Sequence, residues 1–270
     1  MNSTKLMRRK YLILPILLLL MFCSVSYATA AQEADTWQYE LAIYGWLTDI
    51  NADLKFGVPP AEGGGSATVD ASDIIDALNF VFMGAFQARY NKLSFATDII
   101  YMDLSESKSS TINLGPDPGE PVNVSAKLSL KTWLVTGVVG YDVVQTDQAT
   151  LALIGGVRYL NLDSDLGLNA SDPNATPPPA YLSESMDIWD GIVGVKGAYM
   201  LGKNWYLPYY ADIGAGDSQL TWQLYAGIGY MFHWGDIVLG YRYLDYDQDD
   251  DKFVQDLSFY GPLMGVKFKF

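Results

Sequence analysis

The sequence is poor in the residues that most enzymes and metal proteins use. It holds a single cysteine, Cys23, and a single histidine, His233. Cys23 lies in the leader described below, so the processed chain offers no disulfide, thiol nucleophile or cysteine metal site. Positive charge is also scarce, with 17 Lys and Arg against 31 Asp and Glu and a formal net charge of −14. This excess of acid argues against nucleic acid as a partner, because phosphates require a basic surface.

Residues 1–30 have the pattern of a secretory signal peptide, with a basic start, an apolar run and a small-residue cleavage site. The apolar run is shorter than the roughly 20 residues that span a membrane. A retained anchor is the alternative, and a lipoprotein at Cys23 is disfavoured by the bulky residues before it. We therefore expect a signal peptide over residues 1–30 and one domain over residues 31–270.

The rest of the sequence has the pattern of strands. No segment after the leader reaches about 18 consecutive apolar residues, which disfavours a helical membrane protein. Aromatic residues make up 14% of the chain and charged residues only 18%, an apolar composition for segments that alternate between turn signals. The alternation predicts ten strands, at residues 37–56, 79–90, 93–105, 123–144, 149–163, 186–201, 204–214, 219–232, 235–247 and 254–270.

The links between these segments alternate between short and long. This is typical of transmembrane β-barrels, which have tight periplasmic turns and longer outside loops. Within the link at 57–78 we expect a short helix capped by Ser72, lying on the barrel rim or, alternatively, acting as a plug or ligand lid. Short turns are expected at 91–92, 145–148, 202–204 and 233–234; longer links are expected at 57–78, 106–122, 164–185 and 248–253, with a brief one at 215–218.

The last segment keeps its alternation to the final residue. Val266, Phe268 and Phe270 share one side, and Lys267 and Lys269 share the other. Because every backbone polar group in hydrocarbon must be paired, a spanning sheet has to close, and the last strand should pair with the first. We therefore predict an all-β fold, an antiparallel up-and-down transmembrane β-barrel of about ten strands. Eight or twelve strands are the alternatives, and a secreted β-sandwich is the competing fold.

The turn at 91–92 sets a strand register that can be tested against the pattern of polar and apolar residues. Placing Tyr90 opposite Leu93 puts most polar residues of both strands on one face and most apolar residues on the other. A slip of one residue would mix the two faces. The register pairs Arg89 with Ser94, Gln87 with Ala96 and Ala85 with Asp98.

Extending this parity from strand to strand predicts a charged lumen. Isolated buried charges are costly, so these side chains should pair. We expect an interior salt-bridge network in place of an apolar core, with a water-exposed rim position as the alternative for each residue. The candidates are Glu40, Arg89, Asp98, Arg158, Asp190, Lys196, Asp212, Arg242 and Lys267.

Aromatic residues near the strand ends predict the two girdles that mark membrane interfaces. Trp46 falls on the inward parity of its strand and is left out of both. The short-turn girdle would contain Trp37, Tyr90, Tyr199 and Trp205, and the long-loop girdle Tyr159, Trp189, Trp222 and Tyr243.

Together these features resemble small Gram-negative outer-membrane β-barrel proteins. The resemblance is carried by the signal peptide, by "WQYELAIYGWL" at 37–47, by "DIIDALNFVFMGAFQARY" at 73–90 and by the final "KFKF". It implies the cell outer membrane as the location, with outer-membrane lipid and lipopolysaccharide as partners. It also implies that Phe268 and Phe270 are an assembly signal read by the barrel-assembly machinery.

The sequence offers little for catalysis. His233 falls in a predicted short turn, far from acids in the opposite loops, and no nucleophile–base pair is visible. The run of aspartates at 245–251 lacks the glycine and glutamate of an EF-hand, so we interpret it as a solvated loop. A weak divalent-ion site at Asp247, Asp249 and Asp251 is the alternative.

We therefore expect a monomeric outer-membrane barrel without enzyme activity or cofactor. Its expected role is structural or that of a narrow small-solute channel. Surface binding or adhesion through the acidic outer loops is the alternative, and a barrel-embedded hydrolase is a more remote one.

Overall fold

The computed structural model describes residues 36–58, 61–114, 120–170, 180–248 and 254–270. The predicted signal peptide lies outside this range. In the described residues, no helix is long and apolar enough to cross a membrane. The elements are β1 (Gln38–Trp46), β2 (Asp49–Val58), β3 (Ala61–Val69), α3 (Ala71–Ala77), β4 (Leu78–Tyr90), β5 (Leu93–Leu114), β6 (Glu120–Gln145), β7 (Ala149–Ala170), β8 (Ala180–Met200), β9 (Trp205–Gly216), β10 (Leu220–Met231), β11 (Asp236–Asp247) and β12 (Val254–Lys269).

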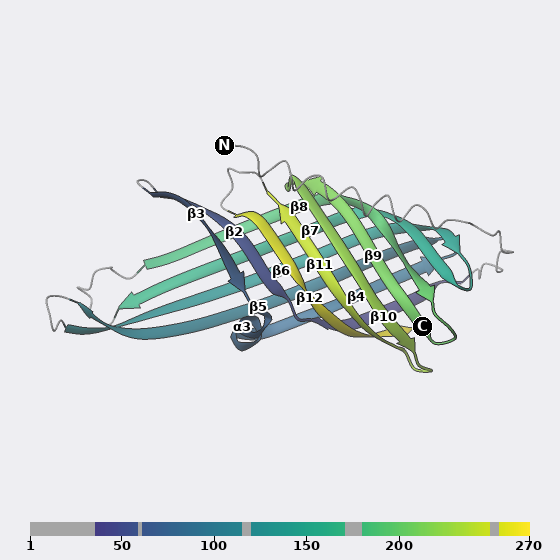
Figure 1. The fold of residues 1–270 in the computed structure, drawn as a ribbon, viewed down its shortest axis with the longest axis horizontal. Helices are drawn as coiled ribbons and strands as arrows, with labels where there is room; N and C mark the ends of the chain where they lie inside the picture. The colour runs from purple at the N-terminus through teal and green to yellow at the C-terminus, as the bar shows by residue number, and fades with distance from the viewer. Residues whose placement is uncertain (1–35, 59–60, 115–119, 171–179, 249–253) are drawn as a thin grey trace. The chain divides into compact units, whose positions relative to one another are not determined.

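The strands form one antiparallel sheet that closes on itself (Figure 1). From β4 to β12 each strand pairs with its neighbour in sequence, and β1 pairs with both β4 and β12. β2 continues from β1 after a break at Leu47 and Thr48, and pairs with the outer half of β12. β1 and β2 therefore act as one barrel strand, so the predicted closed barrel of ten strands is confirmed.

The predicted register across Asn91 and Lys92 is also confirmed. Arg89 lies opposite Ser94, and Ala85 lies opposite Asp98. Asn91 adopts a φ of 51°, a left-handed conformation that asparagine tolerates in a tight turn. The alternation therefore places one set of side chains outside the barrel and the other inside it.

Several outer links differ from the prediction, because the β ladder continues in water beyond the membrane. The pairing of β5 with β6 runs out to Leu114 opposite Glu120, within a segment that was expected to be a loop. The ladders of β6 with β7 and of β7 with β8 extend likewise. Within the link at 57–78, β3 is an added strand that pairs with β2 outside the barrel.

The predicted helix is present as α3, but the prediction that Ser72 caps it is wrong. Asp70 occupies the N-cap position and makes no side-chain cap bond. Instead the backbone N–H of Ala71 donates to Asp49 Oδ1 at 2.7 Å, so the cap comes from β2. On the other side of the helix, Ile74 is buried against Met102 and Leu104 on the inner side of β5.

A close approach of two backbones fixes the point where β12 changes partner from β1 to β2. The Leu47 N–H donates to the Pro262 carbonyl at 2.9 Å, and a Cβ on Gly261 would lie 1.8 Å from the Leu47 carbonyl oxygen. A side chain at position 261 would force these strands apart.

We therefore expect Gly261→Ala to lower the free energy of unfolding by about 1–3 kcal/mol, the usual cost of overpacking. Urea titration of the refolded barrel, followed by its heat-modifiable gel mobility, measures the change. Gly45→Ala is the matched control, because nothing lies within 4 Å of a Cβ there. Equal stability of the two variants would contradict this account of the seam.

Candidate functional site

The nine predicted lumen residues all lie inside the barrel. Six of them line internal cavities, and Arg158, Asp190 and Asp212 are buried. The structure gathers most of them into three separate groups rather than one network. The six cavity-lining residues are Glu40, Arg89, Asp98, Lys196, Arg242 and Lys267.

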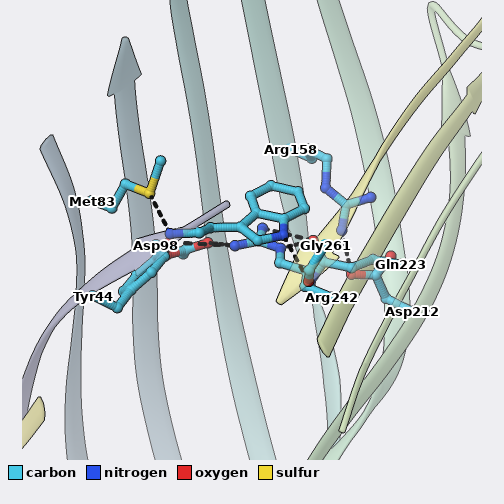
Figure 2. A network of polar contacts seen from close by, with 9 residues as sticks. Tyr44, Met83, Asp98, Arg158, Asp212, Gln223, Arg242 and Gly261 are labelled. Atoms are coloured by element: carbon cyan, nitrogen blue, oxygen red, sulfur yellow. Dashed lines mark hydrogen bonds and ion pairs between the residues drawn. The ribbon is translucent and has the colours of Figure 1, made fainter. Parts of the chain in front are cut away.

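The first group is centred on Arg242 of β11. Its Nη1 lies 2.8 Å from Asp98 Oδ2 and 3.3 Å from the Tyr44 hydroxyl oxygen, and Tyr44 also donates to Asp98. Its Nε and Nη2 donate to Gln223 Oε1 at 3.1 and 2.7 Å. The guanidinium also lies over the ring of Trp46, 4.7 Å from the centroid. Side chains from β1, β5 and β10 therefore meet on one cation of β11 (Figure 2).

The second group is centred on Arg158 of β7. It pairs with Asp212 of β9 (Figure 2), and its Nη1 donates to the Thr221 hydroxyl at 3.0 Å. Both side chains of the ion pair have an exposed fraction of 0%. Asp190 does not join them, because its Oδ1 accepts the backbone N–H of Ser218 at 2.9 Å and so holds the turn between β9 and β10.

The third group lies at the short-turn end of the lumen. Lys267 Nζ is 3.5 Å from both Glu40 and Asp236, and Lys269 Nζ is 2.8 Å from Asp236. Tyr206 donates its hydroxyl to the same aspartate at 2.8 Å. The sequence analysis missed Asp236, although continuing the even-numbered parity of β11 back to its first residue would have found it.

Asp142 is a second residue that the sequence analysis missed, and it too follows the inward parity of its strand. Its Oδ2 lies 3.0 Å from Arg89 Nη1. Across the lumen, Lys196 of β8 donates to Gln87 Oε1 of β4 at 2.7 Å. Lys196 has no carboxylate within ion-pair distance in the described part of the chain.

The expectation of ion pairs in place of an apolar core is wrong, because the lumen contains both. A cluster of buried apolar side chains fills the section beside the arginine groups. Leu160, Leu244 and Tyr246 in it have an exposed fraction of 0%. A narrow barrel leaves just enough interior for side chains to fill, and this one fills it with apolar as well as charged groups. The cluster comprises Trp46, Met83, Ile100, Leu134, Leu160, Ile188, Leu244, Tyr246, Leu257 and Phe259.

Two adjoining cavities occupy the lumen from this cluster toward the short-turn end. The inner one, of about 310 Å³, reaches Asp98 and Arg242. The other, of about 430 Å³, reaches Gln38 and Lys269 at the strand ends. Lys196 lines both cavities and therefore lies where they meet.

The outer surface of the barrel is apolar, with Val193 63%, Met264 61% and Leu153 53% exposed. In water such a surface would drive aggregation, whereas in a bilayer it meets acyl chains. Aromatic rings pair at two levels of the barrel. Trp205 and Tyr230 pair at the short-turn end, 4.8 Å between centroids, and Tyr159 of β7 pairs with Trp189 of β8 farther out, at 4.4 Å. A closed sheet with an apolar exterior and aromatic girdles is the form in which strands span the outer membrane. The chain is an outer-membrane β-barrel.

Comparisons with known proteins find distant similarity to solved outer-membrane proteins. No family model matches the chain, and no curated protein matches it either. The outer membrane protease OmpT from Escherichia coli has a TM-score of 0.49 at 8% identity, covering 89% of this chain and 99% of that one. The translocator domain of autotransporter NalP from Neisseria meningitidis has a TM-score of 0.42 at 15% identity, covering 87% and 89%. Ail, the attachment invasion locus protein of Yersinia pestis, has a TM-score of 0.34 at 8% identity, covering 87% and 99%. All three scores are below 0.5, so the assignment of the chain rests on its own geometry.

The remaining predicted residues lie outside the lumen groups. Phe268 and Phe270 are exposed on the outer face of β12 and just after its end. His233 is exposed in the turn between β10 and β11. Asp247 ends β11, whereas its candidate metal-site companions Asp249 and Asp251 lie outside the described residues. No group of three or more His, Cys, Asp or Glu that could hold a metal ion lies within the described ranges.

The buried pair of Arg158 and Asp212 predicts a large effect of removing one charge. Asp212→Asn leaves the guanidinium buried and uncompensated, so the free energy of unfolding should fall by about 3–5 kcal/mol. Urea unfolding in lipid vesicles measures the loss.

Asp147→Asn, in an exposed turn, is the control and should be neutral. The double variant Arg158→Met, Asp212→Leu should recover most of the lost stability, since it removes both charges together. A double variant less stable than Asp212→Asn would contradict this.

Proposed function

We propose that this outer-membrane barrel has a structural role and does not conduct solutes. The observation that supports this proposal is the complete burial of Leu160, Leu244 and Tyr246 within the lumen. In a water-filled bore, these inward side chains of β7 and β11 could not be shielded completely from solvent. General porin conduction needs the wider lumen of barrels with about 16–18 strands.

The proposal also covers the partners and the absence of catalysis. The barrel works as a monomer without a cofactor, in contact with outer-membrane lipid and lipopolysaccharide. Phe268 and Phe270 serve as its assembly signal. His233, the one histidine in the sequence, sits on the exposed short turn away from the buried charges, which supports a role outside catalysis.

The purified wild-type protein should therefore stay silent in planar bilayers. The double variant Trp46→Ala, Tyr246→Ala removes two rings from the lumen cluster and should produce discrete openings. The control Trp133→Ala removes a ring from the outer face, where Trp133 is 43% exposed, and should stay silent. Heat-modifiable mobility checks that each variant is folded. Openings of the wild-type protein would contradict the structural role and indicate a narrow channel.

A second candidate function is binding at the cell surface, which the extended outer strands favour. The pairing of β4 with β5 stops at Leu104, and the pairing of β8 with β9 stops at Asp190. Beyond these points β5, β6, β7 and β8 pair only among themselves among the described strands, as an outer sheet about 30 Å long at 3.3 Å per residue. Figure 1 shows these long strands. Acidic side chains on its described part include Glu106, Asp163, Asp165 and Asp187.

Trimming this outer sheet tests the second candidate. Ser105 lies opposite Ser129, and Asp163 lies opposite Ser185, so an Asn-Gly turn can close each hairpin at that level. The trimmed barrel should still fold, and cells displaying it should lose most of their binding to poly-L-lysine beads. Unchanged binding would assign the interaction to another part of the surface.

A further inference from the structure

We propose that the inner lumen cavity binds a small amphipathic anion, a flat apolar body carrying one carboxylate. The anion enters from the short-turn end of the barrel and places its acid group on Lys196. This site goes beyond the structural role proposed above and does not depend on it.

One of the basic side chains around the two cavities has no carboxylate partner among the described residues. The cavity walls carry five basic side chains and three carboxylates, in a chain whose net charge is strongly negative. Four of these bases pair with a carboxylate. One of the carboxylates belongs to Asp236, which does not itself line either cavity. The pairs are Arg89 with Asp142, Arg242 with Asp98, Lys267 with Glu40 and Lys269 with Asp236.

Lys196 is the base that remains. Its ammonium group donates to the neutral Gln87 amide at 2.7 Å, and within the described residues it meets no carboxylate at ion-pair distance. Lys196 is partly buried, and a cation withdrawn from water is costly when it is not paired. An anion from solution would supply the charge that Gln87 lacks.

The walls of the inner cavity suit a flat apolar body. One side is made of the small or aliphatic residues Ala42, Ala85, Ala96 and Val138, on β1, β4, β5 and β6. The other side carries three tyrosines, Tyr206 and Tyr210 of β9 and Tyr225 of β10. Aromatic rings favour stacked or edge-on contact with another ring. Small ligands bind in mostly apolar pockets of this size that contain a few polar groups.

The far end of the cavity offers a second polar group. Thr136 lines it with an exposed fraction of 5%, and its hydroxyl has no hydrogen-bond partner in the described part of the structure. Buried hydroxyls are normally satisfied. A ligand with a polar substituent opposite its carboxylate would therefore be held at both ends.

In the described part of the chain, the cavities open toward the short-turn end. The second cavity leads from Lys196 to Gln38 and Lys269, which are both exposed. Toward the outer side, the Arg242 group and the buried apolar cluster close the path. The ligand would therefore come from the periplasm, the side that the short turns face in such barrels.

The probe is 4-fluorobenzoate, followed by ¹⁹F NMR with the full barrel in zwitterionic detergent. The wild type should bind it with a Kd of about 1 mM or tighter. Lys196→Met should weaken binding about tenfold or more, because a charge-assisted hydrogen bond is lost. Lys203→Met, at an exposed turn, should bind as the wild type does. The neutral 4-fluorobenzyl alcohol should bind the wild type and Lys196→Met equally weakly.

A second variant keeps the test decisive if Lys196→Met does not fold. Ala85→Leu fills the cavity without changing any charge and should also abolish binding. The proposal is overturned if the wild type shows no saturable binding. It is equally overturned if either folded variant, Lys196→Met or Ala85→Leu, binds 4-fluorobenzoate as tightly as the wild type.

Discussion

The pairing of backbone amides in hydrocarbon is the constraint on which the rest of the structure depends. Lipid offers no hydrogen bonds, so the sheet must have no open edge within the membrane. The chain meets this requirement by pairing β1 with β12, from Glu40 opposite Lys269 to Trp46 opposite Leu263. Once the sheet is closed, alternation divides every strand between an apolar exterior and a narrow interior.

The narrow interior then holds charged side chains that most globular cores exclude. The inward arginine side chains beside the apolar cluster are buried, so each needs a partner from another strand. Arg242 of β11 pairs across the barrel with Asp98 of β5, and Arg158 of β7 pairs with Asp212 of β9, two strands away. These pairs join strands that are far apart in sequence, while the apolar cluster beside them excludes water and strengthens the electrostatic attraction.

The sequence predicted the features that depend on the two-residue repeat of β-strands and on the need to pair every backbone amide in hydrocarbon. Strand number, closure and the hairpin register from Tyr90 to Leu93 all follow from the two-residue repeat and short turns. The parity also placed candidates such as Arg242 and Asp98 on inward positions. It could not say which side chains meet across the lumen, because that depends on barrel diameter and strand tilt.

The misses have physical causes as well. Loops are predicted at 106–122 and 164–185 from their proline- and glycine-rich stretches, which cannot form membrane strands, yet the ladder of β5 to β8 continues into both links outside the membrane. β3 is rich in glycine and has little strand propensity, so its pairing with β2 is visible only in three dimensions. The cap on α3 comes from Asp49, a residue more than twenty positions away that no local motif reveals.

The position of β3 also sets the depth at which the protein sits. Among the described strands it pairs with β2 alone, so its other edge has to be wetted. Acyl chains cannot reach that height, and on this flank the lipid surface must lie below Ile50, the first residue of β2 that β3 covers. The unpaired edge of β3 therefore marks the upper limit of the lipid surface on this side of the barrel.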